Sequence, residues 1–242
     1  VMVIDVGRYP KKVDGCLRRL GVSKIDLLVL THYDQDHVGG LSGALHARQV
    51  VSSMVTSLPD DRAAADVSVQ QLETAGHPAV RAEIGQTGEL GKLRWQVLNP
   101  PHGGVGTEDF NDASVVFLIS GAEYDLLTLA DLGERGQMRI AQEFGAWAGR
   151  LHQGTPSGLR PLLLKVAHHG SADFYPELYE ALHPDLALIS VGKENRYGHP
   201  TQRALNALEL SGTSILRTDL NGTIAVSVDK RQNLRVSGSG GS

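Results

Sequence analysis

Residues 32–37 read HYDQDH and contain four side chains that commonly bind metal ions, His32, Asp34, Asp36 and His37. They follow an apolar run that is typical of a buried strand. Because residues i and i+2 of an extended chain point to the same side, His32 and Asp34 can share one ion. After a turn, Asp36 and His37 can bind a second ion nearby. Solvated loop charges explain this density of imidazoles and carboxylates poorly, so the segment predicts a metal site.

The elements that must position this segment alternate between strand-like and helix-like runs. In the first part of the chain, strands are expected at residues 1–6, 25–30 and 50–55, and helices at 13–20, 40–47 and 63–75. From about residue 80, short strands separated by Gly, Pro and Asn turns are expected at 80–84, 93–98, 115–119 and 124–129.

The last third of the chain returns to alternation. Helices are expected at 134–148, 175–182 and 201–210, and strands at 159–167 and 185–191. Asn221-Gly222 predicts a closing hairpin over residues 218–228. The pattern predicts an α/β fold of two sheets between helices.

No repeat and no convincing linker divides the chain. We therefore predict one domain over residues 1–236 and a linker-like tail, SGSGGS, at 237–242. The chain opens directly on the strand-like run VMVIDVG without a signal-peptide layout, and it reads like a piece of something longer.

Composition excludes several classes of protein. The 242 residues are 41% hydrophobic and 21% charged, as in ordinary globular proteins. The longest apolar runs fall far short of the roughly 20 residues of a membrane-spanning helix. A net charge of −4 argues against binding nucleic acid by bulk charge, and 5% aromatic residues are few for an extended stacking surface. The single cysteine, Cys16, cannot form an internal disulfide and is read as a packed small hydrophobe.

Four further motifs follow HYDQDH in order: NDASVV at 111–116, LLTLADLG at 126–133, LLKVAHHGS at 163–171 and SVGKENRYGHP at 190–200. HxDxDH resembles the HxHxDH signature of the metallo-β-lactamase superfamily, with Asp34 at the place of the second histidine. Together the motifs resemble the carboxy-terminal metallo-β-lactamase-like domain of the ComEC family, the DNA-uptake channel proteins of competent bacteria.

The resemblance covers nearly the whole chain. Two departures stand out: the strand pair that precedes IDVG in the family is absent, so the amino-terminal strands are expected to be truncated, and TLAD replaces TGD. The fold implied by the resemblance is an αβ/βα sandwich of two mixed sheets flanked by helices.

The resemblance also implies a set of site residues. The implied metal ligands are His32, Asp34, Asp36, His37, Asn111, Asp131 and His168. Asp131 would bridge two ions, although such an aspartate can also cap the helix expected at 134. Asn111 would either ligate through its amide oxygen or orient a water.

The remaining motif residues are expected to contact substrate. His199 would contact the phosphate or the leaving group, and with Asp36 and Asp131 it forms the implied catalytic group. His169 is placed beside the ligand His168. The other substrate-binding candidates are Ser171, Asn195 and Tyr197. The histidines outside these motifs are expected at the surface, at positions 46, 77, 102, 152 and 183.

The carboxylate of Asp34 hardens the site compared with an imidazole. This favours two manganese ions as cofactors, with zinc or magnesium as alternatives. Two dications contribute +4 and the three aspartates −3, so with a bridging hydroxide the cluster is near neutral and an anionic phosphodiester can approach. Two metals about 3.5–4 Å apart can generate that hydroxide and stabilise the attacked phosphate.

The resemblance implies a metal-dependent hydrolase, a nuclease domain that degrades one strand of incoming DNA during natural transformation. It would be a soluble domain at the outer face of the bacterial cytoplasmic membrane, joined to the membrane channel portion of its parent protein, with single-stranded DNA as partner. A basic groove would favour DNA, with Arg62, Arg81, Lys165 and Lys193 as candidates.

Two other functions stay open on the same fold. One is a small-molecule phosphodiesterase similar to phosphocholine esterases, which a closed pocket would favour. The other is a non-catalytic interaction module. The chain has no GxxxxGK[ST] loop and no GxSxG elbow, so neither a nucleotide cofactor nor a serine hydrolase is predicted.

Overall fold

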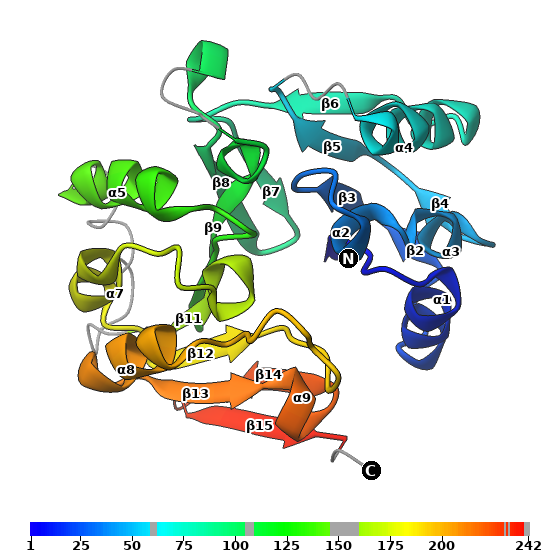
Figure 1. The fold of residues 1–242 in the computed structure, drawn as a ribbon. Coiled ribbons are helices and arrows are strands. Elements are labelled where there is room, and N and C mark those ends of the chain that lie inside the picture. Colours follow the sequence, from blue (N-terminus) through cyan, green and yellow to red (C-terminus); the bar gives the residue numbers. More distant parts are fainter. Residues whose placement is uncertain (59–61, 105–108, 146–159, 230, 232, 240–242) are drawn as a thin grey trace. The chain divides into compact units, whose positions relative to one another are not determined.

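The computed structural model describes residues 1–58, 62–104, 109–145, 160–229, 231 and 233–239 (Figure 1). The chain forms two compact units. The first contains Val1–Gln86 and Val97–Val115, and the second contains Thr87–Gln96 and Val116–Ser242.

The first unit is built on a four-stranded sheet in which every paired strand is parallel. Its strands, in spatial order, are β1 (Met2–Ile4), β3 (Leu27–Leu30), β5 (Ser53–Thr56) and β6 (Ala79–Ala82). All four residues of β3 are buried, as expected of a strand covered on both faces. Two short strands, β2 (Lys24–Ile25) and β4 (Gln49–Val50), form a separate parallel pair. In the chain, β2 precedes β3 and β4 precedes β5.

Helices connect these strands. They are α1 (Pro10–Arg19), α2 (Gln35–Val38), α3 (Leu41–Leu45) and α4 (Ala63–Thr74), and the short turns η1 (His102–Gly104) and η2 (Asn111–Ala113) follow later in the chain. Their apolar residues share one core with the strands, which includes Leu17, Leu28, Leu41 and Leu72.

Helices α1 and α3 approach each other closely at Gly43. A Cβ atom at this position would lie 2.1 Å from the backbone oxygen of Pro10, so the contact requires glycine. Nearby, the guanidinium of Arg48 donates to Asp14 and to the carbonyl oxygens of Val22 and Gly43, with a side chain only 3% exposed. These contacts form a corner that joins α1, α3 and the segment before β2.

The second unit contains a seven-stranded mixed sheet. Its strands, in spatial order, are β13 (Ser214–Arg217), β12 (Leu186–Ile189), β11 (Leu162–Lys165), β10 (Asp125–Thr128), β9 (Val116–Ser120), β8 (Leu93–Asn99) and β7 (Thr87–Leu90). Strands β10 to β13 run parallel, whereas the pairs β9–β10 and β7–β8 are antiparallel. The carboxyl ends of the four parallel strands therefore meet at one edge, where α/β sheets bind ligands.

Three helices follow one another along this sheet, α5 (Glu134–Gln142), α7 (Pro176–Leu182) and α8 (Gln202–Leu210) (Figure 1). The turn η3 (Ala167–Gly170) follows β11, and α9 (Thr218–Asn221) precedes the strands β14 (Ile224–Val228) and β15 (Leu234–Gly238). The predicted helix over 134–148 is confirmed to Gln142, and its last residues, 146–148, lie outside the described part of the chain.

The hairpin predicted around Asn221-Gly222 is wrong. These residues end the short helix α9, where the left-handed φ of +69° at Gly222 stops the helix. The Asn221 side chain accepts a hydrogen bond from the backbone N–H of Arg217. The hairpin that does form pairs β14 with β15, with Val228 opposite Leu234. Strand β15 thus includes residues 237 and 238, the first two of the predicted tail. The sequence did not predict the strand β7.

The α/β class with two sheets and flanking helices is confirmed. The four-stranded sheet is parallel rather than mixed in the pairs described, and the seven-stranded sheet is mixed. None of the helices in the described ranges combines the length and the apolar character needed to cross a bilayer. A single domain over residues 1–236 stays a prediction.

We expect Gly43→Ala to lower the free energy of unfolding by about 1–3 kcal/mol, because the added methyl group overpacks the contact with Pro10. Urea denaturation followed by circular dichroism measures this. Gly15→Ala is the matched control: it lies inside α1, and its new Cβ would find only the Arg19 side chain at 3.7 Å, so it should gain about 0.5–1 kcal/mol. Equal stability of the two variants would contradict this account of the corner.

Candidate metal centre

The first unit presents His32 through a chain of hydrogen bonds that begins at Asp5, directly after β1. The Thr31 hydroxyl donates to Asp5 Oδ2 at 2.8 Å, so its oxygen accepts from His32 Nδ1 at 3.1 Å. This places the ring proton of neutral His32 on Nδ1 and leaves the lone pair on Nε2. That buried atom has no hydrogen-bond partner among the described residues. It is the state in which an imidazole binds a metal ion.

The same carboxylate orients a second imidazole. His37 Nδ1 lies 2.7 Å from Asp5 Oδ2, and since a carboxylate only accepts, Nδ1 of His37 carries the proton. The His32 and His37 rings lie 4.1 Å apart between centroids. Although burial alone would raise it, the charge and hydrogen bond of His37 hold the pKa of Asp5 below its usual range. Asp5 therefore fixes the tautomers of two predicted ligands.

Asp34 lies between an imidazole and a guanidinium. One carboxylate oxygen pairs with Arg62, whose guanidinium stacks 4.0 Å from the centre of the Phe110 ring. The other oxygen faces His32 Nε2 at 3.7 Å. Hydrogen bonds from His32, when its ring is protonated, and from Arg62 hold the pKa of Asp34 well below its usual range, so it is a carboxylate at neutral pH. An imidazole lone pair that faces a carboxylate oxygen at this distance is suited to a cation.

The two remaining candidates of this unit lie on short helical turns. Asp36 is exposed in the first turn of α2, one residue before His37. Asn111 begins the turn η2, and its side chain forms no hydrogen bond with the residues described. The first unit thus brings the side chains of His32, Asp34 and His37 together.

The second unit carries its candidates at the edge where the parallel strands end. Asp131 follows β10 and His168 follows β11, and the N–H of His168 donates to the oxygen of Ala130 at 2.9 Å. Asp131 is buried, with Oδ2 at 3.3 Å from His169 Nε2 and 3.9 Å from His168 Nε2. One carboxylate oxygen therefore faces two imidazoles.

His169 is oriented in the same way as the two histidines of the first unit. Its Nδ1 lies 2.6 Å from the carbonyl oxygen of Ser190, which can only accept, so Nδ1 carries the proton and Nε2 of the neutral ring keeps its lone pair. The sequence ranked His168 as the ligand and His169 as its neighbour. The structure fixes the tautomer of His169, whereas Nδ1 of His168 has no hydrogen-bond partner among the described residues.

Backbone strain accompanies these strand exits. Asp5, Ala130, His168 and His169 all have left-handed φ values, between +43° and +58°. Non-glycine residues in this region cost of order 1 kcal/mol each and persist where the surroundings hold them. Such strain is common at functional sites, and here it occurs just after β1 in the first unit and just after β10 and β11 in the second.

His199 lies on the loop between β12 and α8, which packs on η3. Thr201 donates from its N–H to the Gly170 oxygen at 2.8 Å, and a Cβ on Gly170 would lie 2.6 Å from Pro200. The His199 ring lies 5.6 Å from that of His168. Burial and the neighbouring imidazoles lower the pKa of His199, so this ring is neutral at pH 7 and can donate one hydrogen bond.

Several predicted residues have structural contacts. Ser171 Oγ accepts from the N–H of Asp173, and Lys165 donates to the oxygens of Ala130 and Val166. Arg81 donates to the oxygen of Thr56. Lys165 is thus held inside its unit, whereas Arg81 makes this contact from an exposed position. Of the histidines expected at the surface, 46, 102 and 183 are exposed, 77 is partly buried and 152 lies outside the described residues.

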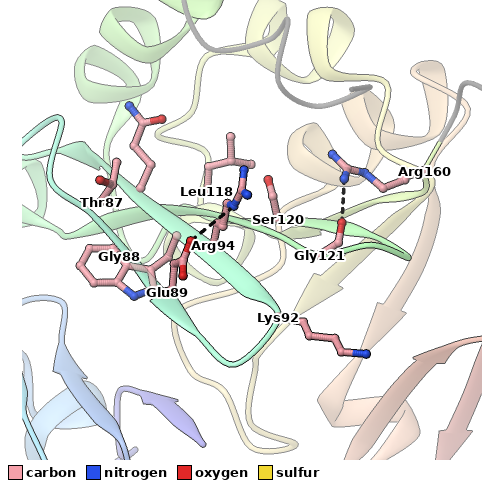
Figure 2. A pocket seen from close by; sticks show the side chains of 11 residues that line it. Thr87, Gly88, Glu89, Lys92, Arg94, Leu118, Ser120, Gly121 and Arg160 are labelled. Atoms are coloured by element: carbon pink, nitrogen blue, oxygen red, sulfur yellow. Dashed lines mark hydrogen bonds and ion pairs between the residues drawn. The ribbon is translucent and has the colours of Figure 1, made fainter. Parts of the chain in front are cut away.

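A hollow of about 700 Å³ lies in the second unit beside β7, β8 and β9 (Figure 2). Its walls include Lys92, Trp95 and two arginines. Figure 2 shows these arginines engaged: Arg94 pairs with Glu89, and Arg160 donates to the oxygen of Gly121. None of the predicted site residues lines it.

Sequence reasoning missed Asp5 and Ser190. The signal for Asp5 was present, because IDVG places one carboxylate at the end of an apolar strand. The neighbour of that strand, β3, leads into HYDQDH, and parallel neighbours end at the same edge. Ser190 contributes its backbone oxygen to His169, which no side-chain pattern reveals.

A family model described as the metallo-beta-lactamase superfamily matches residues 1–137, more than half of the chain. The chain belongs to the metallo-β-lactamase superfamily. Members of this superfamily are generally metal-dependent hydrolases, and the oriented imidazoles of both units fit divalent metal binding.

Comparison with individual proteins confirms the resemblance to ComEC-family competence proteins. The chain is 31% identical over 209 residues to ComE operon protein 3 of Bacillus subtilis (strain 168), covering 84% of this chain and 25% of that protein. It is 28% identical over 243 residues to competence protein ComA of Neisseria gonorrhoeae, covering 97% of this chain and 31% of that protein. The chain thus spans a quarter to a third of these relatives.

The superfamily fold is also found in solved structures. Zn(2+)-bound PqqB from Methylobacterium extorquens is 12% identical, with a TM-score of 0.51 over 89% of this chain and 81% of that one. At this identity the likeness concerns the fold alone.

We expect Asp5→Asn to lower manganese affinity about 10- to 100-fold, because the outer hydrogen bonds that orient two imidazoles are weakened. Thr31→Val should give a smaller loss, since it affects His32 only. Isothermal titration calorimetry of the metal-free protein measures both.

Asp26→Asn is the control, because Asp26 is a carboxylate of the same unit that pairs with Lys24 at the surface. It should leave the affinity unchanged. Wild-type affinity in a folded Asp5→Asn protein would show that Asp5 does not orient the site.

Proposed function

We propose that this chain is a metal-dependent phosphodiesterase, a nuclease domain that degrades one strand of incoming DNA during natural transformation. The competence proteins among its relatives support the link to DNA uptake. We further propose, from the same relatives, that it lies at the outer face of the cytoplasmic membrane, attached to a channel portion of a longer protein.

The observation that carries the proposal is the tautomer of three histidines. The Nδ1 proton of His32 is held by Thr31, that of His37 by Asp5, and that of His169 by the Ser190 carbonyl. A second carboxylate lies close to His32 in the first unit and to His169 in the second. A purely structural role would gain nothing from imidazole lone pairs that face carboxylate oxygens at 3.3–3.7 Å. A bound cation satisfies both acceptors.

We propose that the ligands are His32, Asp34, Asp36 and His37 from the first unit and Asp131 and His168 from the second, with Asn111 as a further oxygen donor. His169 is added to this set because of its fixed tautomer. Asp131 is the proposed bridge, since its Oδ2 faces both imidazoles of its own unit.

The donor set favours manganese. Three aspartates make the site harder than one built from imidazoles, and Asp34 stays ionised beside Arg62. When bound, two divalent ions would supply a nucleophile at neutral pH and positive charge for the phosphate. The carboxylates of Asp34, Asp36 and Asp131 would keep the loaded site near neutral, so that an anionic diester can enter.

His199 is proposed to contact substrate and not metal. Its ring is neutral at pH 7, so it can donate a hydrogen bond to a phosphate oxygen or to the leaving oxygen. Ser171, Asn195 and Tyr197 are the further proposed substrate contacts. This assignment gives Asp36 and Asp131 the charge-balancing role and His199 the positioning of the diester.

The proposal is tested by stripping the protein of metal and refilling it separately with manganese, magnesium and zinc. Single-stranded DNA, duplex DNA and a phosphocholine ester are the substrates. We expect DNA cleavage with manganese well above that with zinc. Asp34→His should shift the preference toward zinc, because an imidazole softens the site.

Three outcomes would contradict the proposal in different ways. Full activity with zinc and none with manganese would overturn the assignment of the metal. Hydrolysis of the choline ester without cleavage of DNA would make the chain a small-molecule phosphodiesterase. No hydrolysis with any metal, in a protein that binds two ions, would make it an interaction module.

A further inference from the structure

The loop between β12 and α8 is held in a defined shape by one residue, Asn195. Its backbone N–H donates to the oxygen of Gly192 at 3.1 Å, its side-chain Oδ1 accepts from the N–H of Tyr197 at 2.9 Å, and its Nδ2 donates to the oxygen of His199 at 2.6 Å. Gly198, with φ of +74°, makes the turn possible. The loop is therefore braced on both sides of Tyr197.

This brace displays Tyr197 to solvent. The side chain is 81% exposed, compared with 54% for the surface residue Tyr9. A single exposed aromatic ring is ordinary on a protein surface. Tyr197 differs from other exposed aromatic residues because it lies in this braced loop, next to His199.

Three rings form a series that leads from the strand ends to the surface. The His168 and His199 rings lie 5.6 Å apart and are nearly perpendicular, and the His199 and Tyr197 rings lie 6.1 Å apart with 31° between their planes. Tyr197 therefore lies one ring beyond the residue proposed to contact the phosphate, and its ring is tilted only moderately from that of His199.

The charges of this loop suit a nucleic acid backbone. Lys193 and Arg196 are exposed in the same loop, against one exposed acid, Glu194. Arg196 forms no ion pair with any residue in the described ranges. Cations around an exposed aromatic ring are the arrangement with which proteins bind unpaired nucleotides, with the ring stacking on a base and the cations near the phosphates.

We propose that Tyr197 stacks on the nucleobase next to the phosphate that His199 contacts, so that the site selects an unpaired strand. The proposal rests on the proposed function of this site. In a duplex both faces of an internal base are covered by its neighbours, so Tyr197 can reach only a base that is unpaired or at a frayed end. A single aromatic ring is enough to stack on one base, so the low aromatic content of the chain does not contradict this proposal.

Fluorescence of 2-aminopurine tests this without catalysis, because stacking quenches its emission. Metal-free protein is titrated with an oligonucleotide that carries one 2-aminopurine among abasic sites, and binding of the fully abasic oligonucleotide is measured by competition. We expect quenching on binding and a roughly 5- to 100-fold higher affinity for the oligonucleotide with the base.

Tyr197→Ala should abolish both the quenching and the difference between the two oligonucleotides, and Tyr197→Phe should restore them. Tyr197→Leu is an apolar control without a ring, and Tyr9→Ala removes an exposed tyrosine elsewhere. In the manganese-loaded protein, the preference for single-stranded over duplex DNA should fall by a similar factor in Tyr197→Ala.

Quenching and affinity that are unchanged in Tyr197→Ala, in a protein that cleaves DNA, would overturn the stacking role and leave the nuclease proposal intact. A wild-type protein that neither binds these oligonucleotides nor cleaves DNA with any metal would overturn both.

Discussion

The carboxylate of Asp5 is the acceptor on which the candidate site of the first unit depends. It receives the Thr31 hydroxyl and the Nδ1 proton of His37, and through Thr31 it also fixes the proton of His32. Because both rings donate away from the site, their Nε2 atoms keep their lone pairs. The charge of Asp5 would also stabilise a cation bound nearby. The partly buried carboxylate after β1 thus orients two imidazoles after β3.

The second unit also fixes the tautomer of a histidine, but it uses a different acceptor. A backbone carbonyl, that of Ser190, replaces the carboxylate as acceptor for His169, and Asp131 supplies the negative charge. The backbone at Ala130, His168 and His169 is left-handed, which turns the chain sharply at the ends of β10 and β11. Stability gained in the sheet and its helices holds this strained edge in place. The strand ends that are costly to build are those that carry the predicted site residues.

Sequence reasoning succeeded where one local pattern decides the structure. The apolar run before HYDQDH predicted a buried strand with ligands at its exit, and the structure has β3 there. It failed where a pattern is ambiguous or where the partner is distant. Asn-Gly ends a helix as readily as it makes a hairpin, and at Asn221-Gly222 the helix end prevailed. Asp5 is 26 residues from Thr31 and Ser190 is 21 from His169, so only the fold reveals either contact. The prediction that His168 is the ligand and His169 its neighbour was made without the Ser190 contact, and it stays a prediction.

The central claim is that the protein sets the tautomers of His32, His37 and His169 before any metal binds. Long-range proton–nitrogen correlation spectra of the metal-free protein at about pH 8, where imidazoles are neutral, measure this directly. Each ring is assigned by replacing one histidine with glutamine. We predict that all three carry the proton on Nδ1 and have an unprotonated Nε2. Spectra in which these rings carry the proton on Nε2, or exchange freely between tautomers, would contradict the account.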